Sequence, residues 1–149
     1  MTLHLLKLCV GVATIDELVE WIEEQQLYAR RAGRTFEQKH TTRMVPKRLD
    51  DLLHSGDGPG SLYWVIKGHI ACRQRLTGIR PFTDSEGIGR CHLLLEPTVV
   101  PVSPRPFRAF QGWRYLSAKD APSDLGARAT GLDTMPEELR RELAGLGLI

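Results

Sequence analysis

Hydrophobic and polar side chains alternate along residues 62–76. The even positions are almost all apolar or small: Leu62, Trp64, Ile66, Gly68, Ile70, Cys72, Gln74 and Leu76. The odd positions hold most of the polar and cationic side chains: Tyr63, Val65, Lys67, His69, Ala71, Arg73 and Arg75. Successive side chains of a strand point to opposite faces, so the pattern predicts one long strand with a core face and a basic face. Gly68 in its middle predicts a bulge or a bend.

The basic face of this strand is the first candidate for function, because a hydrophobic core needs only the even positions. Its cations form a stripe that ends at an aromatic ring: Lys67, His69, Arg73 and Arg75, with Tyr63 at the end. A concentration of positive charge attracts an anionic partner, and the ring could stack on a base. The stripe favours a polyanion or a phosphate-bearing partner and names no reaction.

Residues 15–31 predict an amphipathic helix. Thr14 followed three residues later by Glu17 is the signature of a capping box, and Gly33 is a typical C-terminal stop. The acidic side chains of this helix fall on the solvent side: Glu20, Glu23 and Glu24. The apolar residues 3–12 before it predict a buried strand.

The remaining pattern predicts short strands at residues 38–44, 90–96, 99–102 and 107–116. Short helices are predicted at residues 46–53 and 118–125, and a further helix from residue 134 to about residue 144. This order indicates a single α+β domain, residues 1–149, with a curved, mainly antiparallel sheet flanked by helices. Because two of the predicted strands contain glycines, a small closed barrel is the alternative architecture.

Charge is unevenly spread along the chain. Residues 28–115 carry 15 Lys or Arg against 7 Asp or Glu, and both ends of the chain are acidic. Three cysteines without a CxxC motif fit free thiols in a reducing cytoplasm, and no apolar run reaches 18 residues, so no membrane partner is expected. The imidazole and thiol groups do not have the spacing of a zinc site: His40, His69, Cys72, Cys91 and His92. We therefore expect neither a metal nor a cofactor.

A second group of cations interleaves with aromatic residues and supports the first. It comprises Arg43, Lys47 and Arg48 before the long strand, and Trp113 and Arg114 after it. Single-stranded nucleic acid is held by cations on its backbone and by rings under its bases, so RNA binding without catalysis is the leading hypothesis.

Three other interpretations stay open. The basic face could serve an enzyme or sensor for a small anionic ligand, with His69 as the group that titrates. The acidic helix could be the contact surface of a protein-interaction or assembly subunit. Alternatively, the arginines could be paired internally with nearby carboxylates: Asp50, Asp51, Asp84 or Glu86.

Several uncommon strings occur in a recognisable order: MTLHLLKLCVG from Met1, TRMVPKR from Thr42, SLYWVIKG from Ser61, and FQGWRYL from Phe110. In these strings the chain resembles, from end to end, a mainly alphaproteobacterial family known as domain of unknown function 1489. The resemblance implies a bacterial cytoplasmic protein, and it transfers no catalytic or binding residue.

The order of elements also offers an analogy of fold. A basic segment, a short helix, a glycine loop and a long bent strand are similar to the small RNA-binding barrels of the pseudouridine-synthase-associated (PUA-like) type. Fold analogy alone does not establish function.

Overall fold

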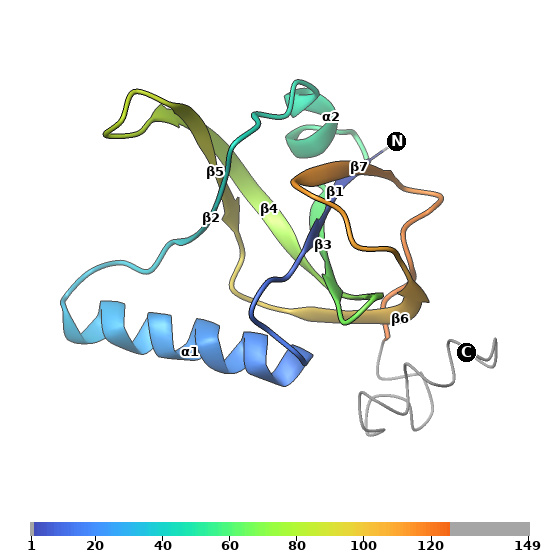
Figure 1. Cartoon of the computed structure of the whole chain (residues 1–149), viewed down its shortest axis with the longest axis horizontal. Coiled ribbons are helices and arrows are strands. Elements are labelled where there is room, and N and C mark those ends of the chain that lie inside the picture. Colours follow the sequence, from blue (N-terminus) through green and yellow to red (C-terminus); the bar gives the residue numbers. More distant parts are fainter. Residues whose placement is uncertain (1, 126–149) are drawn as a thin grey trace.

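The computed structural model describes residues 2–125, which form an open, mixed α+β fold (Figure 1). The elements in chain order are β1 (Leu3–Leu8), α1 (Ile15–Arg31), β2 (Gln38–Thr42), α2 (Leu49–Leu53), β3 (Ser61–Ile66), β4 (His69–Thr83), β5 (Gly89–Leu95), β6 (Val100–Pro106) and β7 (Trp113–Ser117). The helix expected from residue 134 lies outside the described residues.

The prediction of one strand over residues 62–76 is wrong, because β3 and β4 form a hairpin. The two residues between them are Lys67 and Gly68, whose φ angles are +46° and +77°. Two successive residues with positive φ make the kind of turn whose twist matches that of paired strands. The chain therefore reverses at Gly68, where the sequence indicated only a bend.

A bulge explains why the alternation continues through the turn. The two-residue turn places Ile66 opposite His69, which would move the apolar set of β4 to odd positions. The register then shifts by one residue, so that Trp64 lies opposite Cys72 and Leu62 opposite Gln74. Opposite residues share a face of the sheet, and even positions return to the core.

The sheet is mainly antiparallel, as predicted, and it does not close into a barrel. The strands follow the order β2-β5-β4-β3-β1-β7, and β6 pairs with β4. Only β1 and β3 run parallel among the strand pairs of residues 2–125. The long strand β4 joins the two halves, because its first half pairs with β3 and β6 and its second half pairs with β5.

Apolar clusters cover both sides of the sheet. On one side, Ile15, Leu18 and Ile22 of α1 pack against a cluster that includes Leu62 and Trp64. On the other side, Leu6, Tyr63, Val65, Ile70, Val102 and Leu116 form a second cluster. Figure 1 shows α1 and α2 at opposite ends of the sheet.

The helix over residues 15–31 is confirmed together with its cap. The Thr14 hydroxyl oxygen accepts a hydrogen bond from the Glu17 N–H at 3.1 Å. The Glu17 carboxylate in turn accepts from the Ala13 N–H at 2.8 Å. These bonds satisfy two donors at the start of the helix, which is the purpose of a capping box.

Two predictions near the end of the described chain need correction. The strand predicted over residues 107–116 is limited to β7, because the chain turns at Gly112, where φ is +69°. No helix forms at residues 118–125. Instead the Leu125 N–H donates to the Pro101 oxygen at 2.9 Å, so this segment runs beside β6. Pro122 disfavours a helix, because proline excludes helical geometry in the preceding residue.

Gly60 is the position where the fold tolerates least change. Its N–H donates to the Leu52 oxygen at 2.7 Å and its carbonyl accepts from the Leu76 N–H at 2.9 Å. A Cβ atom at residue 60 would overlap the carbonyl oxygen of Leu3. The glycine therefore lets α2, β1 and β4 approach one another.

We expect Gly60→Ala to lower the free energy of unfolding by about 3 kcal/mol or more, because the backbone of β1 must move away. Urea denaturation followed by circular dichroism measures this loss. Gly56→Ala is the matched control, since nothing lies within 4 Å of a Cβ atom there. Equal stability of the two variants would contradict the close approach.

Candidate functional site

Arg73, the centre of the predicted stripe, lies in an internal ion pair. Its Nε and Nη2 atoms donate to the two carboxylate oxygens of Asp124 at 2.8 and 2.7 Å, and Nη1 donates to the Ser61 hydroxyl at 3.0 Å. The hydrogen bond to Asp124 raises the pKa of Arg73 and lowers that of Asp124. With 18% of its side chain exposed, Arg73 ties β4 to the segment that follows β7. Arg73 is therefore paired internally, but with Asp124 and not with any of the four carboxylates proposed from the sequence.

Tyr63 lies opposite Arg73 and is buried in the second apolar cluster, with 4% exposure. The rings of Tyr63 and His4 pack edge to face with their centroids 5.1 Å apart, and burial raises the pKa of Tyr63. The His4 Nδ1 atom accepts from the Ser61 N–H at 2.9 Å, while burial, with a smaller contribution from Arg73, lowers the pKa of His4 to about 4. The structure thus covers the ring that the sequence offered for stacking.

The other cations of the stripe are more exposed. Lys67 lies in the hairpin turn, and the His69 ring is 3.3 Å from the Lys67 carbonyl oxygen. Arg75 is exposed on β4. Neither Lys67 nor Arg75 forms an ion pair with any residue from 2 to 125. No carboxylate of that range neutralises their charge.

The second predicted group is brought together in part, through β7. The Trp113 indole donates to the Met44 oxygen at 2.8 Å, and the Tyr115 hydroxyl accepts from the N–H groups of Lys47 and Arg48 at 3.0 and 3.2 Å. Arg48 also pairs with Asp51 at 3.0 Å, which is one of the internal pairs considered as an alternative. These contacts hold segment 43–48, which is exposed apart from the buried Pro46, against β7.

Arg43 and Arg114 complete this group. Arg43 is exposed on the same segment as Lys47. Arg114 lies between Trp113 and Tyr115 on β7, so its side chain points to the other face of the strand. There its guanidinium lies 4.7 Å from the centre of the Phe110 ring. Arg114 therefore does not share a surface with Trp113.

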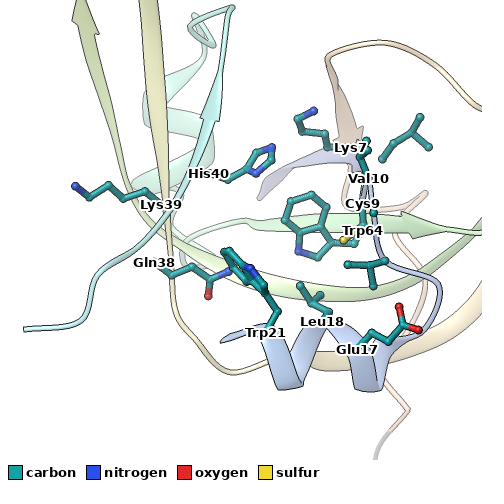
Figure 2. Close-up of a pocket in the computed structure, with 13 residues that line it drawn as sticks. Lys7, Cys9, Val10, Glu17, Leu18, Trp21, Gln38, Lys39, His40 and Trp64 are labelled. Atoms are coloured by element: carbon teal, nitrogen blue, oxygen red, sulfur yellow. The ribbon is translucent and has the colours of Figure 1, made fainter. Parts of the chain in front are cut away.

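A cavity lies elsewhere in the described structure, between the end of β1, the start of α1, β2 and β3 (Figure 2). Its volume is about 460 Å³. Side chains from all four elements line it, including Lys7, Trp21, Gln38, His40 and Trp64. We call it the indole cavity, because Trp21 of α1 and Trp64 of β3 both face it.

A buried amide network fixes the Trp64 wall of the indole cavity. The Trp64 indole donates to the Gln74 side-chain oxygen at 2.9 Å. The Gln74 amide nitrogen donates to the Gln38 side-chain oxygen at 2.7 Å and to the Glu96 carbonyl oxygen at 2.8 Å. Gln74 is fully buried with both its nitrogen and its oxygen satisfied, which rigidifies the wall.

His40 and Lys7 set the electrostatics of the indole cavity. The rings of His40 and Trp64 pack edge to face with their centroids 5.0 Å apart. Burial, with a smaller contribution from Lys7, lowers the pKa of His40 to about 4. Its Nε2 atom is buried and has no hydrogen-bond partner among the described residues. Burial also lowers the pKa of Lys7. Lys39 reaches away toward Glu37, at 3.9 Å, and so contributes little charge inside.

The remaining titratable groups that line the cavity are held in unreactive states. Burial raises the pKa of the Cys9 thiol to about 11, which keeps it protonated at neutral pH. The Glu17 carboxylate is engaged by the Ala13 N–H. No group of three or more His, Cys, Asp or Glu within residues 2–125 is placed to hold a metal ion.

Sequence reasoning did not select the residues of the indole cavity. His40 entered only as a metal ligand to be discarded, and Trp64 only as a core residue. Two signals were visible: Lys7 interrupts an apolar strand, and Trp21 is a large ring among the acidic side chains of the helix. Neither signal indicates that the four segments meet.

The class of structure is thus an α+β fold with an open sheet and an aromatic-lined cavity. The chain belongs to the family described as protein of unknown function (DUF1489), whose model matches residues 5–149. No curated protein and no solved structure gives a match. Neither helix of residues 2–125 has the length and apolar character needed to span a membrane.

We expect Arg73→Ala and Asp124→Ala each to lower the free energy of unfolding by about 1–2 kcal/mol, since each removes charged hydrogen bonds at a partly exposed site. Because the two side chains form one unit, the double variant should lose clearly less than the sum of the single losses. Urea unfolding of all four proteins measures the coupling, and additive losses would contradict the pair.

The Arg73–Asp124 pair also predicts a pH dependence. A carboxyl whose folded pKa is lowered contributes stability above its unfolded pKa of about 4, and that contribution is lost as the pH falls through the folded pKa. The stability difference between the wild type and Asp124→Asn should therefore be constant above pH 5 and shrink in more acidic solution. A difference that does not change down to pH 2 would contradict the assignment.

His4 and His40 should both titrate near pH 4, because burial disfavours their charged forms. Unfolded histidine titrates near pH 6.5, so both residues make stability fall as the pH drops from about 6.5 to 4. An NMR titration of the histidine ring protons measures each pKa, and the exposed His54 is the internal control. Midpoints near 6.5 for His4 and His40 would contradict their burial.

Proposed function

We propose that this protein is a non-enzymatic module that binds RNA or another phosphate-bearing partner. The observation that carries the proposal is the indole cavity, where two indole rings and a neutral imidazole lie beside the ammonium group of Lys7. Single-stranded RNA presents a planar ring and a phosphate together. Proteins bind it by stacking on aromatic side chains and by neutralising its backbone.

Exposed cations support the same proposal. Lys67, Arg75 and Lys47 carry no ion pair within residues 2–125, so their charge is available to a phosphate chain. The basic face predicted from the sequence is thus reduced to dispersed exposed cations, and Arg73 is not one of them. Such cations raise affinity without reading sequence.

Binding is favoured over catalysis by the state of the cavity's reactive groups. The Cys9 thiol stays protonated, and the neutral His40 has no nucleophile hydrogen-bonded to it among the described residues. A nucleophilic mechanism needs a nucleophile and a base within hydrogen-bonding reach of each other.

One observation favours a second candidate function, a sensor or enzyme for a small anionic ligand. Lys7 is partly buried beside a cavity whose volume suits a small molecule. A free nucleotide or a similar aromatic anion would meet the same rings and the same ammonium group. The two candidates differ in whether a strand beyond one unit adds affinity.

The proposal extends to the structural relationship with a known class of modules and to the cellular compartment. The RNA-binding role would relate this open sheet to the PUA-like modules, from which it differs by not closing into a barrel. A cytoplasmic location suits three cysteines that form no disulfide among the described residues, of which Cys72 and Cys91 are buried.

Fluorescence anisotropy of a labelled ten-nucleotide single-stranded RNA, measured at several salt concentrations, tests the proposal. We expect micromolar or tighter binding, with a log–log salt slope of about −0.7 for each phosphate contact. Lys67→Ala with Arg75→Ala should weaken binding about tenfold and make the slope shallower by about 1.4, because two contacts are lost.

The matched control for this test is Arg80→Ala with Arg90→Ala. It removes the same charge, but those arginines are held by Glu37 and Asp84. Equal weakening by the two double variants would mean that only net charge matters. Absence of binding at 50 mM salt, together with thermal stabilisation by one class of small anion, would replace the RNA proposal with the second candidate.

A further inference from the structure

We infer that the indole cavity binds one unpaired nucleobase of the RNA strand, which stacks on the exposed Trp21 ring and is bordered by Trp64, while Lys7 contacts an adjoining phosphate. The inference rests on the proposed function and specifies where and how the partner is recognised. Its argument comes from the size of the cavity, the two unlike walls, and the polar atoms left inside.

The size and enclosure of the cavity favour a single ring. About 460 Å³ lies within the range of small-molecule sites, and the walls come from a helix and three strands (Figure 2). A base pair within a duplex keeps its rings stacked and its edges paired, so it cannot enter a cavity of this size. The partner must therefore present an unpaired base that has left its stack.

The two indole walls differ in a way that suits capture of a ring. Trp64 is 3% exposed and is fixed by its hydrogen bond to Gln74, so it is a rigid surface. Trp21 is 46% exposed, and no hydrogen bond links its indole to any described residue. A base that stacks on Trp21 would cover this apolar area without breaking an existing interaction.

The polar atoms of the cavity are complementary to a ligand that has a neutral polar part and an anionic part. The buried His40 Nε2 has no hydrogen-bond partner among residues 2–125, and leaving such a group unsatisfied is unfavourable. The edge of a base carries neutral donors and acceptors that could satisfy it. The ammonium group of Lys7 requires an anion instead, which the phosphate provides.

Other occupants fit these groups less well. An alkyl chain would cover the indoles but leave His40 and Lys7 without polar partners. Inorganic phosphate would neutralise Lys7 and leave both rings bare. A nucleotide unit is the ligand chemistry that satisfies the rings, the imidazole and the ammonium group at once.

The first experiment compares a nine-nucleotide single-stranded RNA with the same RNA carrying one abasic nucleotide, and with a fully paired duplex. One stacked base is worth about 1–3 kcal/mol, which corresponds to about a 5- to 150-fold change in affinity. We expect the abasic site to weaken binding by at least fivefold at one position, and the duplex to bind at least tenfold more weakly than the single strand.

Variants locate the effect in the cavity. Trp21→Ala should weaken binding to the intact RNA by at least fivefold and abolish the penalty of the abasic site, and Trp21→Phe should restore most of the loss. Tyr28→Ala is the matched control, since Tyr28 is an exposed ring of the same helix outside the cavity. Because Trp21 is exposed, these variants should keep the wild-type melting temperature.

The outcomes separate the inference from the proposed function. If the wild type binds RNA but neither the abasic site nor Trp21→Ala changes affinity, the cavity inference is overturned while RNA binding stands. If RNA does not bind but nucleoside monophosphates quench the tryptophan fluorescence of the wild type and not of Trp21→Ala, the cavity holds a base and the strand-binding proposal fails. If neither RNA nor nucleotides bind, both fail together.

Discussion

The Gln74 side chain is the constraint on which the arrangement of the molecule depends. Its amide lies at the centre of the sheet and bonds to Trp64 on β3, to Gln38 on β2 and to the backbone after β5. These partners belong to both halves of the sheet, which β4 joins directly. Hydrogen bonds of a fully satisfied buried amide are directional, so the network rigidifies the junction between the halves. The rigid wall of the indole cavity is a by-product of this bond network.

Much of the fold could be predicted from local signals. The capped helix over residues 15–31 and the antiparallel character of the sheet follow from capping chemistry and from alternation. The hairpin between β3 and β4 could not, because the turn at Lys67 and Gly68 and the bulge after Ile70 each shift the alternation by one residue and cancel. The helix predicted over residues 118–125 is wrong because the backbone hydrogen bond from the Leu125 N–H to Pro101 of β6 joins residues that are remote in sequence.

The candidate site was less predictable than the fold. The sequence gives the charge of Arg73 but not its partner, because Asp124 lies 51 residues away. Burial then decides the role of each group: it converts Tyr63 from a stacking ring to a core residue, and it makes His40 a neutral hydrogen-bonding group. The indole cavity is assembled from four segments, so no single stretch of sequence contains its pattern. The exposed cations Lys67 and Arg75 are the part of the basic face that patterning placed on the surface.

The paired turn and bulge have a consequence for how this chain can change in length. Loss of one residue between Gly68 and Cys72 would not be a local lesion, because it would reverse the inward and outward sense of every later position in β4. Leu76 would then face solvent, and Arg75 would face the core. Gain of one residue would do the same. Insertions and deletions in this short segment are therefore tolerable only two residues at a time. The length of the loop before β3 does not decide which way later side chains face, so it has no such restriction. Across lineages, the length of the segment between Gly68 and Cys72 should therefore stay constant, while the loop over residues 54–59, which ends before Gly60, can vary in length.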